Sequence, residues 1–166
     1  HENYHAGIAF AGGIPVWVPL RPPHYRFDAE ELARAFQQKP KAVLFNSPHN
    51  PSGRVFTDQE LSTIRDLCVE HDVVAITDEI YEHLVFDGLR HLPIARYSGM
   101  QDRTITICGL GKTFAVTGWR VGYCIASAEL TDAVRKVHDF TTVCAPTPLQ
   151  EAMAAVIGLP DSYYEW

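Results

Sequence analysis

Short apolar runs alternate with segments of helical periodicity along this chain, and the alternation constrains its fold more than any other feature. The apolar runs with the length and composition of buried strands are 41–45, 73–77, 104–107 and 121–126. Amphipathic helices are expected at 28–38, 57–71, 128–140 and 149–157. Strands that alternate with helices predict an α/β fold, with a mostly parallel sheet covered by helices on both faces.

Capping residues mark where two of these helices begin. Asp28 is placed to cap the first, and Thr57 with Glu60 forms the capping box of the second. The residues of the third helix expected to face inward are Leu130, Val134 and Val137. The apolar run at 14–20, closed by Arg-Pro-Pro, predicts one further strand.

Composition limits the classes of protein to consider. The chain has 166 residues, 46% of them hydrophobic and 20% charged, which suits one globular domain with a core. No apolar run approaches the roughly 18 residues of a membrane span, and a net charge of −6 without a basic tract argues against a nucleic-acid partner. The four scattered cysteines indicate reduced thiols and a cytoplasmic protein. No metal-ligand spacing occurs among the eight histidines, so we expect no metal site.

A lone lysine, Lys112, follows Gly111 in a loop that is too glycine-rich to be expected as a helix. Three interpretations compete for it: a phosphate-binding P-loop, a lysine that forms an imine with a carbonyl cofactor, or a solvated surface lysine. A P-loop requires a glycine where Thr106 stands and an uninterrupted helix where Gly118 intervenes. In P-loop proteins the phosphate loop also comes before the strand that ends in an acidic residue. Here the order is reversed, because Asp78 comes 34 positions before Lys112. These mismatches disfavour the P-loop.

Polar side chains follow three of the predicted strands. Asn50, Asp78 and Lys112 each come just past a strand end, and parallel strands would present all three along one edge of the sheet. Tyr81 lies one turn after Asp78, and Arg120 directly precedes the last strand. Each has a plain structural explanation as a turn, cap, core or surface residue. Together they offer a nucleophilic amine, a carboxylate for a cationic ring nitrogen, a phenol, an amide and a guanidinium suited to phosphate.

Three motifs carry a family resemblance. They are Asn-Ser-Pro-His-Asn-Pro-Ser-Gly at 46–53, Ile-Thr-Asp-Glu-Ile-Tyr-Glu at 76–82 and Gly-Lys-Thr-Phe-Ala-Val-Thr-Gly-Trp-Arg-Val-Gly at 111–122. In this order and spacing the chain resembles the class I and II aminotransferases, which are fold-type I pyridoxal-phosphate enzymes, and within them the kynurenine, methionine and N-succinyldiaminopimelate branch. The resemblance implies pyridoxal 5'-phosphate as cofactor. It also implies transfer of an amino group from an amino acid to a 2-oxo acid.

The same resemblance implies a role for each candidate residue. Lys112 would form the imine with the cofactor and move a proton during the reaction. Asp78 would pair with the pyridinium nitrogen, so that the ring acts as an electron sink. Asn50 and Tyr81 would hydrogen-bond the ring's phenolic oxygen, and Arg120 would bind the phosphate.

Some features depart from the family pattern. Gly109 stands where family members often carry a phosphate-binding serine. Residues 1–166 would form only part of the cofactor-binding large domain, without the small domain that closes over substrate. The aromatic ring that stacks on the cofactor belongs near the start of the chain, where His1 and Tyr4 lie. By resemblance we expect a homodimer.

Two alternatives to aminotransferase activity remain open at this point. One keeps pyridoxal phosphate but changes the reaction to β-elimination from a cysteine conjugate. The other is a catalytically inactive fragment. The residues that select the substrate are expected to lie mostly outside this segment.

Overall fold

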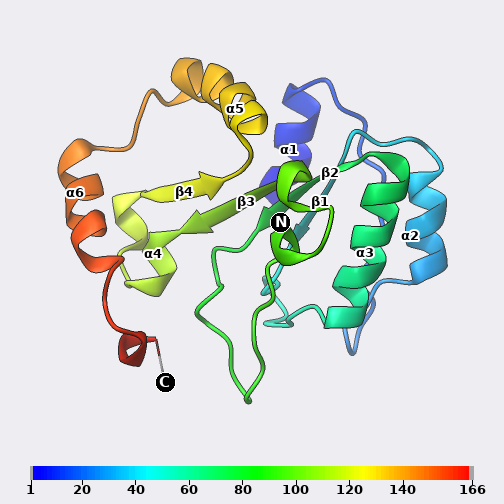
Figure 1. Ribbon diagram of the computed structural model, residues 1–166, viewed down its shortest axis with the longest axis horizontal. Coiled ribbons are helices and arrows are strands. Elements are labelled where there is room, and N and C mark those ends of the chain that lie inside the picture. The colour runs from blue at the N-terminus through cyan, green and yellow to red at the C-terminus, as the bar shows by residue number, and fades with distance from the viewer. Residues whose placement is uncertain (1, 165–166) are drawn as a thin grey trace.

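The structure is a computed structural model that describes residues 2–164 (Figure 1). Its helices are α1 (Glu2–Phe10), α2 (Ala29–Phe36), α3 (Asp58–His71), α4 (Leu110–Thr113), α5 (Ala128–Thr141) and α6 (Thr147–Val156). Its strands are β1 (Ala42–Asn46), β2 (Val74–Asp78), β3 (Thr104–Gly109) and β4 (Gly122–Ile125). Short 3-10 turns span Ile94–Arg96, Gln101–Arg103, Thr117–Trp119 and Asp161–Tyr163.

The strands form one sheet in the order β1-β2-β3-β4. The pairs β1–β2 and β2–β3 are parallel, and β3–β4 is antiparallel. In this register Asp78 lies between Asn46 on one side and Ile107 on the other. The predicted α/β fold with a mostly parallel sheet is confirmed.

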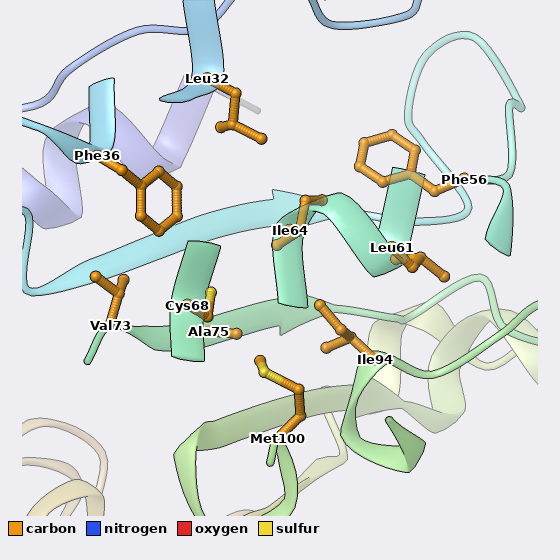
Figure 2. Packing of buried hydrophobic residues seen from close by; sticks show 10 residues of the cluster. All are labelled: Leu32, Phe36, Phe56, Leu61, Ile64, Cys68, Val73, Ala75, Ile94 and Met100. Carbon is orange, nitrogen blue, oxygen red and sulfur yellow. The ribbon is translucent and has the colours of Figure 1, made fainter. Parts of the chain in front are cut away.

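The core lies between the sheet and the pair of helices α2 and α3 (Figures 1 and 2). Its buried residues are Leu32, Phe36, Phe56, Leu61, Ile64, Cys68, Val73, Ala75, Ile94 and Met100. Both helices begin as predicted: Asp28 accepts from the Glu31 amide at 2.9 Å, and the capping box of Thr57 and Glu60 is complete. A full capping box satisfies two of the amides that a helix start leaves unpaired.

The two faces of the sheet differ in burial. Along β2 the side chains alternate, so Ala75 and Thr77 are fully buried against the core whereas Asp78 points to the second face. On that second face Ile107, the neighbour of Asp78 in register, is 42% exposed. Helix α1 lies over it, because Tyr4 contacts Asp78. The Asp78 side chain therefore lies on the face of the sheet that is less buried than the core face.

Three local predictions are wrong. Residues 14–20 form no strand, because Pro15 and Pro19 lack the N–H that a strand ladder needs, and Ile14 and Trp17 are 90% and 65% exposed. The Lys112 segment is a single helical turn, α4, rather than a loop. Val137 does not face inward, since it is 64% exposed and α5 buries none of its residues.

Helix α2 ends at Phe36, two residues before the predicted end at 38. The chain turns away there, because Lys39 adopts a left-handed conformation just ahead of Pro40. Within the described residues, no helix combines the length and the apolar character needed to cross a bilayer.

Candidate active site

The carboxyl ends of β1, β2 and β3 meet at one edge of the sheet, and the backbone around Asp78 is held from both sides there. The side-chain amide of Asn46 donates to the Asp78 carbonyl at 2.8 Å, and the Ser47 amide donates to the same oxygen at 3.1 Å. On the other side the Glu79 amide donates to the Ile107 carbonyl at 2.8 Å. Three hydrogen bonds thus hold the backbone on both sides of Asp78, and none of them involves the Asp78 carboxylate.

The Asp78 carboxylate has a partner on each oxygen. Its Oδ1 accepts from the Ile80 amide at 3.2 Å, and its Oδ2 accepts from the phenol of Tyr4. Burial, together with the neighbouring Asp78 carboxylate, raises the pKa of Tyr4 well above its ordinary value of 10.0. The phenol therefore remains a donor to the carboxylate at all ordinary pH values.

Asn50 and Tyr81 come together from the loops that follow β1 and β2. The loop after β1 folds on itself, since the Asn50 amide donates to Asn46 Oδ1 at 2.7 Å. The side-chain amide of Asn50 then lies 3.4 Å from the Tyr81 hydroxyl. Two groups separated by 31 positions thus face the same space beside Asp78.

Lys112 lies on α4, directly after β3. Its amine is 5.9 Å from the centroid of the Tyr81 ring, and none of the ion pairs of the described residues involves it. The residue is partly buried. Gly111 permits this turn, because an added Cβ would lie 3.0 Å from the Thr117 Cα as the chain returns. A partly buried amine over an aromatic ring, with no carboxylate partner, is suited to act as a nucleophile.

Arg120 lies apart from this group. It adopts a left-handed conformation with φ of 54°, and one guanidinium nitrogen donates to the Thr117 carbonyl at 3.1 Å. Its side chain lines a cavity between the start of β4 and the carboxyl end of α5, shared with His138, Thr142, Cys144 and Gln150. The structure shows no direct contact of Arg120 with Asp78 or Lys112 within the described residues. Its guanidinium retains donors for an anion.

Residues 1–165 match the family described as aminotransferase class I and II. The chain belongs to this family. The match covers nearly the whole chain.

Individual members of the family are similar in sequence and structure. The bovine kynurenine–oxoglutarate transaminase 3 is 44% identical over 163 residues, covering 92% of this chain and 36% of its own. The solved N-succinyldiaminopimelate aminotransferase of Mycobacterium tuberculosis superposes with a TM-score of 0.95 at 40% identity, covering 99% of this chain and 43% of its own. An Escherichia coli structure with a methionine aminotransferase function gives 0.93 at 34% identity, covering 99% and 43%. The chain thus spans well under half the length of these aminotransferases.

Gly109, the departure from the family's serine, has a packing reason. A Cβ added at Gly109 would lie 2.5 Å from Cγ1 and 2.7 Å from Cδ1 of Ile80, distances that real Cβ atoms essentially never show. Ile80, two residues after Asp78, fills the space that a serine side chain would need. The absence of the hydroxyl and the position of Ile80 are therefore coupled in this chain.

The site also contains one polar contact that sequence reasoning missed. From the sequence, Tyr4 and His1 are candidates for the ring that stacks on the cofactor, and His1 lies outside the described residues. The structure shows the Tyr4 phenol on the Asp78 carboxylate instead. No motif links the two residues, so no signal in the sequence alone could have identified the pair.

Proposed function

We propose that the protein containing this chain is a pyridoxal-phosphate-dependent aminotransferase that moves an amino group from an amino acid to a 2-oxo acid. Membership of the aminotransferase family supports this function. The observation that carries it is the Lys112 amine, which lies over the ring of Tyr81 and has no ion-pair partner among the described residues, while the Tyr81 hydroxyl faces the side-chain amide of Asn50. A cofactor with an aldehyde and a ring hydroxyl requires an amine that can form an imine with the aldehyde, which Lys112 offers. It also requires hydrogen-bonding groups for the ring hydroxyl, which Tyr81 and Asn50 offer.

The remaining side chains complement the other parts of pyridoxal phosphate. We assign the Asp78 carboxylate to the ring nitrogen, Asn50 and Tyr81 to the ring hydroxyl, and Arg120 to the phosphate. The cofactor, when bound, supplies an electron sink for charge that develops at the substrate's Cα. Each polar group of the cofactor is thereby assigned a side chain of opposite or complementary character.

The chain's own residues have distinct tasks in this proposal. Tyr4 and the Ile80 amide orient the Asp78 carboxylate, which keeps the ring nitrogen protonated. Lys112 would hold the cofactor through its amine, and as a free amine it would carry the proton that leaves the substrate's Cα. The aromatic face of Tyr81, 5.9 Å from the Lys112 amine, would restrain the position of that amine.

The proposal extends to the whole protein. Because the chain spans only 36% to 43% of its relatives, we propose that residues 1–166 form part of the large domain, with the small domain supplied elsewhere in the protein. We further propose a homodimer, as the family resemblance implies. The four cysteines are free thiols, which supports the cytoplasm as its location.

The test is amino-group transfer by the intact protein, measured with a panel of amino acids and 2-oxo acids. We expect the Lys112→Ala variant to lose at least about 10²–10⁴-fold in rate, because it lacks both the attachment point and the proton carrier. Lys41→Ala, at an exposed lysine before β1, is the matched control and should retain the wild-type rate. Transfer at the wild-type rate by Lys112→Ala contradicts the proposal. Release of ammonia and pyruvate from a cysteine conjugate, without transfer, would indicate β-elimination instead.

A further inference from the structure

A second polar cluster lies directly behind the candidate site and has no role in the function proposed above. Glu79, the residue after Asp78, has a side chain that is only 2% exposed, and that of His91 is 7% exposed. The Nε2 atom of His91 lies 2.5 Å from Glu79 Oε2, and the Thr77 hydroxyl donates to Oε1 at 2.8 Å. Both carboxylate oxygens are therefore satisfied in a buried setting.

The position of this cluster follows from the alternation of side chains along β2. Thr77 and Glu79 point to the core face of the sheet, whereas Asp78 between them points to the second face. The contact between Glu79 and His91 thus lies on the opposite side of the backbone from the Asp78 carboxylate. Any movement of the Glu79 side chain is transmitted to Asp78 through a single peptide unit.

The same contact closes the loop that carries Tyr81. Glu79 and His91 are 12 positions apart, and their pair joins the two ends of the segment between them. The amides of Glu82 and Leu84 donate within the first part of this loop, each at 2.8 Å, whereas residues 86–90 are exposed. His91 is therefore the side chain that ties the return of the loop to the end of β2.

A buried carboxylate is stable only while its partners remain in place. Without the His91 ring, Glu79 would hold one hydroxyl donor and one unpaired oxygen away from water. Its side chain would then turn toward solvent and move the backbone at 78–82. Active-site groups lose much of their effect when displaced by about 1 Å.

We propose that His91 is a positioning residue, which acts through Glu79 to hold the Asp78 carboxylate and the Tyr81 phenol in register for the cofactor. This inference rests on the proposed function. It assigns His91 no contact with cofactor or substrate. The Nδ1 atom of His91 is buried and has no hydrogen-bond partner in the described residues. The contact of Nε2 with Glu79 is therefore the one polar contact of this ring among those residues.

The experiment compares three variants of the intact protein. His91→Phe keeps the ring volume but removes the contact, and His91→Gln retains an N–H group for Glu79. Met100→Ala is the control for a general loss of stability. Met100 is fully buried in the core cluster, which contains none of the candidate site residues. The readouts are amide hydrogen exchange of the cofactor-free protein and the dissociation constant for pyridoxal phosphate, both measured where every variant is folded.

We expect His91→Phe to increase exchange at the amides of Glu79, Glu82 and Leu84 and to raise the dissociation constant by about 10- to 100-fold, the range seen when supporting side chains of a site are removed. His91→Gln should remain within about threefold of the wild-type constant, as a replaced donor restores the contact. Met100→Ala should lower the melting temperature but leave both readouts near wild type.

Equal changes in His91→Phe and Met100→Ala would overturn the proposal, since they would show a general effect of stability. Unchanged exchange at the three amides in His91→Phe would overturn it as well. A wild-type protein that binds no pyridoxal phosphate would contradict the proposed function itself. In that case hydrogen exchange in the cofactor-free protein still decides whether His91 holds residues 79–84.

Discussion

The phenol of Tyr4 donates a hydrogen bond to the carboxylate of Asp78, across 74 positions of sequence. This contact places the first helix over the carboxyl end of β2 and partly shields Asp78 from water. A carboxylate held by two hydrogen-bond donors keeps its direction. The residue assigned to the cofactor's ring nitrogen is therefore oriented by a segment that lies far from it in the chain.

Removing the Tyr4 hydroxyl tests this contact. We expect Tyr4→Phe to lower the free energy of unfolding of the cofactor-free protein by about 1–3 kcal/mol, the usual effect of losing a hydrogen bond to a charged group. Tyr25→Phe is the control, because its hydroxyl makes no hydrogen bond in the described residues, and it should change stability by less than about 0.5 kcal/mol. Denaturant unfolding measures both. Equal losses in the two variants would argue against a special role for Tyr4.

The hydroxyl of Tyr81 is assigned to the cofactor's ring oxygen. Tyr81→Phe keeps the ring beneath the Lys112 amine and removes only the hydroxyl that faces Asn50 at 3.4 Å. Without the Tyr81 hydroxyl, the cofactor's ring oxygen would carry more negative charge and would stabilise a proton on the Lys112 nitrogen that is bonded to the cofactor. We therefore expect the pKa of that nitrogen, read from the cofactor's visible absorbance, to rise. An unchanged absorbance titration would show that Tyr81 does not reach the ring oxygen.

Gly109 and Ile80 should behave as a coupled pair. Gly109→Ser alone should destabilise the protein by about 1–3 kcal/mol, because the new side chain overlaps that of Ile80. In the double variant with Ile80→Ala, the space is free and the total loss should be smaller than the sum of the single losses. Chemical denaturation of all four proteins completes the cycle. Strict additivity would contradict the coupling.

The ion pair of Arg54 and Glu60 predicts a pH dependence of stability. Burial opposes ionisation of Glu60, but hydrogen bonds from Thr57 and the Arg54 guanidinium outweigh it, and the pKa of Glu60 is lowered below its ordinary 4.5. The folded form thus binds its proton less readily than the unfolded chain. The stabilisation is complete above pH 4.5 and is lost as the pH falls through the lowered pKa.

Glu60→Gln measures that contribution. Because the two side chains are 12% and 13% exposed, we expect a loss of about 1–3 kcal/mol at pH 7. The difference from wild type should shrink as the pH is lowered below 4.5. Glu30→Gln, whose partner contact with Arg34 is solvent-exposed, is the control and should change little. A difference that stays constant between pH 7 and pH 3 would exclude the linkage.

Much of the fold could be predicted because its signals are local. Thr57 and Glu60 set the start of α3 within a few residues of each other, and the apolar runs set β1, β2 and β3. The run at 14–20 is also apolar but forms no strand, because its two prolines, Pro15 and Pro19, lack the backbone N–H that a strand ladder needs. The helical turn at Lys112 was missed because a glycine lowers helix propensity only modestly and packing outweighs it.

The site could be predicted as far as parallel strands determine it. Asn50, Asp78 and Lys112 each follow a parallel strand, so their approach at one sheet edge follows from topology. The contacts of Tyr4 with Asp78 and of His91 with Glu79 depend on where a helix and a loop return to the sheet. No spacing rule links those segments, and only the folded structure reveals them.

In the proposed function, Lys112 binds the cofactor covalently. Borohydride treatment of the intact protein loaded with pyridoxal phosphate reduces the carbon–nitrogen double bond to a stable secondary amine, and peptide mass spectrometry then locates the label. We predict a phosphopyridoxyl group on the peptide that contains Lys112 and on no other lysine. A label on a different lysine, or no label in protein shown to hold the cofactor, would contradict the account.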